Sequence, residues 1–221
     1  NQKKEASQSI SLAIKFGILF SIPAFFGLFI FSNEIISLLF YRGAFELSDV
    51  QLTGSALIAL CFGLPAFIMI KILVVPFFAN EDTKTPIKIS LFCMLINLIL
   101  NLILIKDFFH VGLAISTSIS AWVNSMLLIY VLKKKINYSL DLSILKVFLK
   151  VIIASSLMSY IILQAYEFII NNFNDYSFFN TNFTLLMCII LGTIIYALLV
   201  YLLGTNELEI DKWKNQKKKL N

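Results

Sequence analysis

Six long apolar segments constrain the fold of this chain more than any other feature of its sequence. They cover approximately residues 13–31, 52–78, 87–105, 111–132, 144–166 and 183–203. A helix needs about 20 apolar residues to cross a bilayer, because the hydrocarbon core is about 30 Å thick. Hydrophobic residues make up 59% of the chain, whereas soluble domains are about 45–50% apolar. The sequence therefore predicts an all-α, polytopic membrane protein with six transmembrane helices.

The basic residues predict how these helices are oriented. One side of the membrane would hold Lys3, Lys4, Lys84, Lys88, Lys133, Lys134, Lys135, Lys146, Lys150, Lys212, Lys214, Lys217, Lys218 and Lys219. The other side would hold Arg42 and Lys106. Cytoplasmic loops carry an excess of lysine and arginine, so this distribution places both termini in the cytoplasm.

Local signals predict several helix boundaries. Ser48 and Gln51 form a capping-box pattern at the start of the second segment. Pro76 lies near the end of that segment, and Pro86 suits the first turn of the next helix, with Thr85 as its N-cap. Pro76, Thr85 and Pro86 together predict a short turn between the second and third helices.

The chain divides into two parts of unequal size. Residues 1–135 contain four predicted helices, the third and fourth of which form a tight antiparallel hairpin through residues 106–110. Residues 136–221 contain two further helices and a basic tail, which we expect to contact anionic lipid and not nucleic acid. The opening residues resemble the middle of a longer protein.

Lys71 is the first candidate functional residue. It lies about 12 Å from the nearer end of its predicted helix, judged from about 1.5 Å of rise per residue. Ionisable residues at such depth usually face a polar cavity or a partner, although a lysine side chain can also snorkel to the interface. Pro65 and Pro76 flank Lys71 and each frees a backbone carbonyl, which favours a role in a pathway.

Two polar stripes lie on the third and fourth predicted helices. Asn97 and Asn101 share one helix face, and Ser116, Ser120 and Asn124 share another, because residues four apart lie on the same side of a helix. Such side chains usually join helices by hydrogen bonds within lipid. The alternative role is to line a cavity.

Two loops contain further candidates for gating. Arg42 and Gly43 lie on the sparsely charged side, where a turn and a latch that grips a carboxylate or phosphate are both possible. Asp82, Thr83 and Lys84 lie in the turn between the second and third helices. There, helix capping and surface ion pairing compete with gating.

Several kinds of chemistry find no support in the sequence. Cys61, Cys93 and Cys188 each lie in an apolar segment, which predicts neither disulfides nor a metal site. The residues near His110 in the sequence form neither a metal-binding set nor a pair of nucleophile and base. A phosphate-binding glycine loop is also missing from the sequence. We therefore expect no cofactor, no metal and no enzymatic activity.

Short motifs over the first 135 residues resemble the MurJ (MviN) family. They are LFYRGAF at 39–45, GLPAF at 63–67, PFFA at 76–79, DTKTP at 82–86 and HVGLA at 110–114, together with Lys71 and Asn124. Members of this family are lipid II flippases in the superfamily of multidrug and oligosaccharide-lipid exporters. The resemblance implies a partial fold of that kind, corresponding to helices nine to fourteen of a fourteen-helix, two-lobed protein.

The same resemblance implies a function. Such a protein would move undecaprenyl-pyrophosphate-linked peptidoglycan precursor across the bacterial inner membrane by alternating access, without nucleotide. Its partners would be lipid II, membrane lipids and the missing N-terminal helices. Two features depart from the family pattern: the arginines of the first lobe have no counterpart here, and Asn80 and Glu81 stand where many members have a basic residue. The alternatives are a flippase for another polyprenyl-linked glycan, or a non-transporting assembly subunit or decayed fragment.

Overall fold

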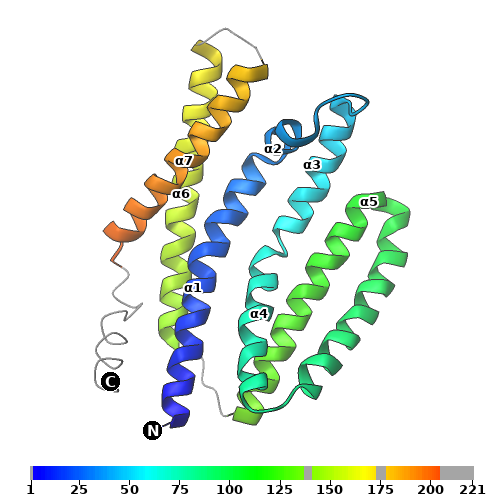
Figure 1. Cartoon of the computed structure of the whole chain (residues 1–221), viewed down its shortest axis with the longest axis vertical. Coiled ribbons are helices and arrows are strands. Elements are labelled where there is room, and N and C mark those ends of the chain that lie inside the picture. The colour runs from blue at the N-terminus through cyan, green and yellow to red at the C-terminus, as the bar shows by residue number, and fades with distance from the viewer. Residues whose placement is uncertain (1, 137–140, 173–177, 205–221) are drawn as a thin grey trace.

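The computed structural model describes residues 2–136, 141–172 and 178–204, and the regular structure in these ranges is helical. Figure 1 shows the helices in chain order as α1 (Gln2–Ile30), α2 (Ser32–Phe40), α3 (Leu47–Cys61), α4 (Leu64–Ala79), α5 (Lys84–Ile136), α6 (Leu142–Asn172) and α7 (Phe178–Leu202). The predicted tail at 205–221 and the predicted boundary between the two parts at 137–140 lie outside the described residues.

The helices account for the six predicted crossings. In the described ranges, α1, α5, α6 and α7 are each long and apolar enough to cross a membrane, and α3 with α4 passes the same test as a pair bent by 40°. Helix α5 is a hairpin, because the helical conformation breaks at Phe109 (φ 48°, ψ −129°) and the chain turns back (Figure 1). Three single helices, two hairpin arms and one bent pair thus give an all-α, multi-pass membrane protein.

The second crossing is broken and not continuous as predicted. The amide of Gly63 bonds to a carbonyl three residues back, so the carbonyl of Ala59 lacks its usual intrahelical donor. The hydroxyl of Ser118 in α5 donates to that Ala59 oxygen at 2.6 Å, and the Trp122 indole donates to the Phe62 oxygen at 2.8 Å. A Cβ at Gly63 would lie 2.7 Å from the Ser118 Oγ, so glycine allows this close approach.

Two expectations about helix ends need correction. Helix α3 begins with Glu46 as its N-cap, and the Glu46 and Asp49 side chains each bond the other residue's amide. The predicted pair of Ser48 and Gln51 lies inside the helix, because a carboxylate pair two residues earlier caps it first. Pro65, which was expected to free a carbonyl inside a continuous helix, instead lies in the first turn of α4, where a missing amide proton costs little.

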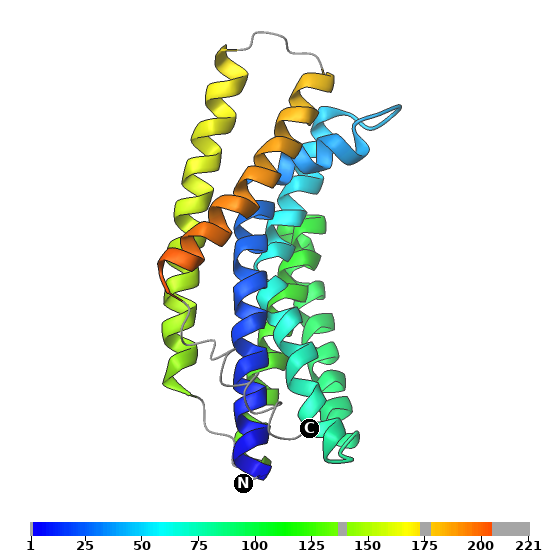
Figure 2. The same cartoon turned by 60° about the vertical axis from the view of Figure 1, so that its left-hand side comes forward.

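Two apolar clusters hold the helices together. The larger cluster joins α1, α4, the second arm of α5 and α6 through buried Ile14, Leu73, Leu128 and Val151. The smaller cluster joins Phe31 to α6 and α7. Helix α7 crosses α6 diagonally (Figure 2). Just after the end of α7, the Gly204 carbonyl oxygen accepts a hydrogen bond from the Lys150 ammonium of α6 at 2.8 Å.

The turns lie at two ends of this bundle (Figure 1). The start of α1, the turn between α4 and α5, and the end of α5 lie at one end, which we call the lysine-rich end. The connection between α2 and α3 and the tip of the α5 hairpin lie at the other, which we call the hairpin end. This arrangement agrees with the loop pairing predicted from the basic residues.

Candidate functional site

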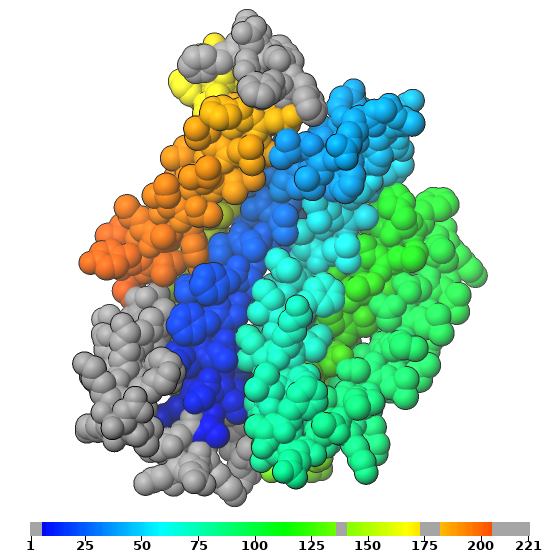
Figure 3. All heavy atoms as spheres, in the orientation of Figure 1, coloured from blue at the N-terminus to red at the C-terminus, as the bar shows by residue number. Residues whose placement is uncertain are grey.

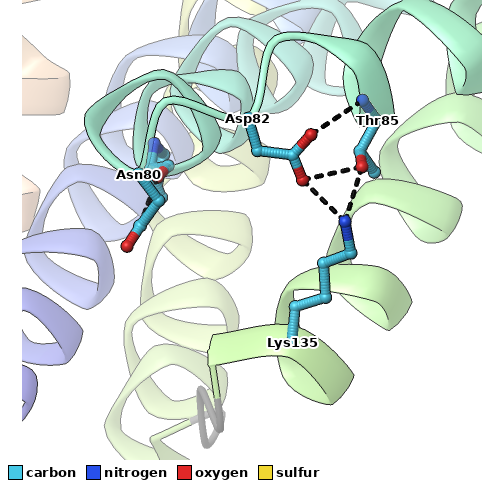
Figure 4. Close-up of polar contacts among 5 residues, drawn as sticks. Asn80, Asp82, Thr85 and Lys135 are labelled. Carbon is cyan, nitrogen blue, oxygen red and sulfur yellow. Dashed lines mark hydrogen bonds and ion pairs between the residues drawn. The ribbon is translucent and has the colours of Figure 1, made fainter.

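A polar clasp closes the lysine-rich end between α4 and α5 (Figure 4). The Asp82 carboxylate accepts hydrogen bonds from the Thr85 amide (3.1 Å), the Thr85 hydroxyl (2.7 Å) and the Lys135 ammonium (2.7 Å). Lys135 lies in the last turn of α5 and also donates to the Thr85 hydroxyl at 2.7 Å. The clasp therefore ties the start of the hairpin to its end, 50 residues later in the chain.

The clasp corrects the predicted cap of α5. Asp82, and not Thr85, supplies the capping side chain, because its carboxylate reaches the Thr85 amide three residues on. Pro86 is buried in the first turn of α5, as predicted. At the preceding helix end, the Asn80 side-chain amide donates to the Pro76 carbonyl oxygen at 2.7 Å and closes α4. Thr83 and Lys84 are exposed.

The clasp holds the Asp82 carboxylate in its charged form. The hydrogen bond from Lys135 is the main cause, followed by those from Thr85, and together they lower the pKa of Asp82 from 3.8 to about 2. A folded-state pKa below the unfolded value stabilises the protein above the unfolded pKa. This stabilisation is therefore complete above pH 3.8 and is lost as the pH falls through about 2.

We expect the Lys135→Met variant to lose this pH-dependent part of its stability. Its melting temperature should be lower than that of the wild type at pH 5, and the two values should converge as the pH falls from 3.8 to 2. Thermal unfolding of the detergent-purified protein at a series of pH values measures this difference. Lys133→Met is the matched control, because Lys133 is exposed in the same last turn and should leave the profile unchanged. A constant gap between wild type and Lys135→Met at all pH values would contradict the assignment.

Lys71 is exposed on the face of α4 that points away from the core. At 100° per residue, Val75 and Phe78 share this exposed face, whereas buried Ala66 and Leu73 lie on the opposite face. Among the described residues, no ion pair includes Lys71. Helices α1 and α4 form the middle of one side of the molecule, between α7 and α5 (Figure 3).

The asparagines of α5 join the two arms of the hairpin. The Asn97 side-chain amide donates to the Ser120 hydroxyl at 3.0 Å and to the Thr117 hydroxyl at 3.4 Å. The Asn101 amide donates to the Asn97 carbonyl oxygen at 2.9 Å. These contacts favour the helix-joining role for Asn97 and Asn101. Among the residues that the structure describes, none donates a hydrogen bond to the buried side-chain oxygens of Asn101 and Asn124.

Arg42 and Gly43 form an exposed turn at the hairpin end. Gly43 has a φ of 64°, a conformation that glycine adopts without strain. The Arg42 carbonyl oxygen accepts from the Phe45 amide at 3.3 Å, which closes the turn. Within the described ranges, the guanidinium of Arg42 makes no ion pair. The observed role of these two residues is to form the turn.

Sequence reasoning missed two lysine contacts. In the sequence, Lys135 was used only as one of the basic residues that predict how the helices are oriented in the membrane. Its position at the end of the hairpin brings it to Asp82. Lys15 lies inside the first apolar segment of the sequence. Its side chain is buried, and its ammonium lies 3.9 Å from the Asp141 carboxylate at the start of α6. An isolated lysine inside an apolar segment was the available signal in the second case.

Known proteins resemble this chain along nearly all of its length. The model of the family described as "Lipid II flippase MurJ" matches residues 1–184. A probable lipid II flippase MurJ from Rickettsia prowazekii is 43% identical over 150 residues, which are 68% of this chain and 30% of the relative. Another from Buchnera aphidicola subsp. Schizaphis graminum is 32% identical over 220 residues, which are 99% of this chain and 42% of the relative.

A solved structure agrees with these sequence matches. A lipid II flippase MurJ in an inward closed conformation matches with a TM-score of 0.71 and 25% sequence identity. The match covers 91% of this chain and 42% of that chain. This chain thus spans less than half the length of each of these relatives.

Proposed function

Because this chain belongs to the lipid II flippase MurJ family, we propose that it supplies helices nine to fourteen of a lipid II flippase in the bacterial inner membrane. Apart from family membership, the main observation that supports this proposal is the position of Lys71. A charged side chain inside an apolar helix is costly in lipid and needs water or a partner. Lys71 is exposed on an otherwise apolar helix face. In this position its ammonium group can bind an anionic headgroup that moves along the same face.

The proposed route combines two environments. The polyprenyl tail of the substrate remains in lipid, while the pyrophosphate passes along the face that carries Lys71. An ammonium group forms charge-assisted hydrogen bonds with phosphate oxygens, which offset part of the cost of removing the phosphate from water. The remaining helices of the family would cover this face and complete the cavity. Transport would be driven by membrane potential or an ion gradient.

The clasp of Asp82, Thr85 and Lys135 supports such a role by fixing the geometry at one end of the route. It holds the end of α4 against both ends of the α5 hairpin. Asn97 and Asn101 hold the two arms of the hairpin together deeper in the bundle. In this proposal, α4 moves with α5 as one body when the protein changes between its inward and outward states.

We also propose that the lysine-rich end faces the cytoplasm. Single cysteines at exposed Ala44 and Lys134 are expected to react differently with a membrane-impermeant maleimide. Ala44→Cys should react in intact spheroplasts, and Lys134→Cys should react only after permeabilisation. The native cysteines are buried, so their background labelling should be low. The opposite labelling pattern would reject the proposed orientation.

Growth of cells depleted of their own lipid II flippase tests the proposed activity. We expect this chain to restore growth when it is expressed together with the N-terminal helices of a family member. We expect no growth from either part alone, because this chain spans less than half the length of its relatives. If the two parts reach the membrane together and growth still fails, the chain does not serve lipid II transport.

A further inference from the structure

A pocket of about 270 Å³ is lined by residues of α2, α3, α6 and α7. Of these helices, α2 lies toward the hairpin end (Figure 1). Its lining residues are Asn33, Glu34, Ser37, Leu47, Val50, Gln51, Tyr166, Asn182 and Leu185. Among the described residues that line the pocket, Glu34 is the one that carries a charge. The pocket is separate from the clasp and from the face that carries Lys71, so its role does not depend on the proposed route.

One oxygen of the Glu34 carboxylate lacks a hydrogen-bond donor among the described residues. Its Oε2 atom is buried and makes no hydrogen bond in the described part of the chain. A buried carboxylate oxygen without a partner is unfavourable, because it has lost its hydration without compensation. The residues that line the pocket include no lysine, arginine or histidine that could neutralise Glu34. None of the amide or hydroxyl donors in the described lining bonds this oxygen. A cationic ligand that enters the pocket would supply both the missing donor and the missing charge.

The other groups in the pocket indicate what kind of cation fits. Asn33, Gln51 and Asn182 each offer a side-chain carbonyl oxygen, and Ser37 and Tyr166 offer hydroxyl oxygens. Together with Glu34 they form a set of acceptors, while Leu47, Val50 and Leu185 form an apolar wall. An ammonium group has three N–H donors and no acceptor, which suits several oxygen acceptors around one carboxylate.

The size and composition of the pocket argue against a bare metal ion. Its volume is about 270 Å³, whereas about 10–15 Å³, measured in the same way, is enough to hold one water molecule. Within the described ranges, no cluster of three or more His, Cys, Asp or Glu residues could hold a metal ion. We propose that this pocket binds the primary ammonium group of a small organic ligand or lipid headgroup, with Glu34 as its counter-ion.

Two sources could supply this ammonium group: a phosphatidylethanolamine headgroup and a soluble amine. The test uses the purified full-length gene product in phosphatidylcholine nanodiscs, with or without phosphatidylethanolamine, and in a titration with ethanolamine. Choline lipids are a suitable background, because their quaternary ammonium has the same charge and no N–H donor. Thermal unfolding and native mass spectrometry measure stabilisation and retained lipid.

The Glu34→Gln variant should bind the ammonium ligand about tenfold more weakly or worse, since a hydrogen bond to a charged group is lost. Glu167→Gln is the matched control, because Glu167 is an exposed carboxylate one residue from Tyr166 and outside the lining. It should bind like the wild type. A response to phosphatidylethanolamine alone identifies a lipid headgroup, and a response to ethanolamine identifies a soluble amine. Equal responses of Glu34→Gln and the wild type to both ligands, or no response of the wild type to either, would overturn the proposal.

Discussion

Replacing Lys71 with methionine is expected to reduce lipid II transport by about tenfold or more, since a charge-assisted contact with the pyrophosphate would be lost. Methionine keeps much of the length and flexibility of the lysine side chain but removes its charge. Membrane insertion should be unchanged, because the substitution removes a charge from an apolar helix. Growth and lipid II translocation in flippase-depleted cells measure the effect in the full-length protein.

Two further variants separate a transport role from a general need for positive charge. Lys71→Arg should retain most of the activity, because arginine also binds phosphate oxygens. Lys88→Met removes an exposed lysine near the start of α5 and should transport like the wild type. Unchanged translocation in Lys71→Met, at equal protein levels, would show that Lys71 does not contribute to the pathway.

Replacing Gly112 with alanine is expected to destabilise the α5 hairpin by about 1–3 kcal/mol, a typical cost of overpacking a close contact. A Cβ at Gly112 would lie 2.6 Å from the Leu104 carbonyl oxygen in the opposite arm. Since that neighbour is backbone, a change of rotamer cannot relieve the clash and the two arms must separate. Thermal unfolding of the detergent-purified protein should show a lower melting temperature.

The same substitution at Gly27 provides the matched control. A Cβ at Gly27 in α1 would meet nothing within 4 Å. Alanine is favoured over glycine in helices by up to about 1 kcal/mol, so Gly27→Ala should unfold at the wild-type temperature or slightly above it. If Gly27→Ala and Gly112→Ala had equal melting temperatures, the close approach of the two hairpin arms would be wrong.

The sequence was sufficient to predict the crossings because length and hydropathy determine which helices can cross a bilayer. It also predicted the hairpin turn, since residues 106–110 are too few for anything other than an antiparallel connection. The break at Gly63 was not predictable in the same way. It depends on Ser118 and Trp122, which lie more than 50 residues away in the chain and bind the carbonyls at the break.

The candidate site shows the same limit. Asp82 was a candidate because of its place in a charged turn, but its partner Lys135 lies 53 residues later and only the folded hairpin brings them together. Likewise, Glu34 lies just after the first apolar segment of the sequence, where nothing local marks it as a site residue. Its buried oxygen becomes evident only when α2, α3, α6 and α7 enclose it. Local patterns thus identified helices and turns, while long-range contacts determined which polar side chains meet.

Outer-leaflet lipid II is the most direct measure of whether this chain serves a flippase. The chain and the remaining family helices would be produced together in flippase-depleted spheroplasts, and an added lipid II hydrolase would report how much substrate has crossed the membrane. We predict that cleavage returns when both parts are present and stays low when either is omitted. Cleavage that stays at the depleted level with both parts inserted in the membrane would contradict the account.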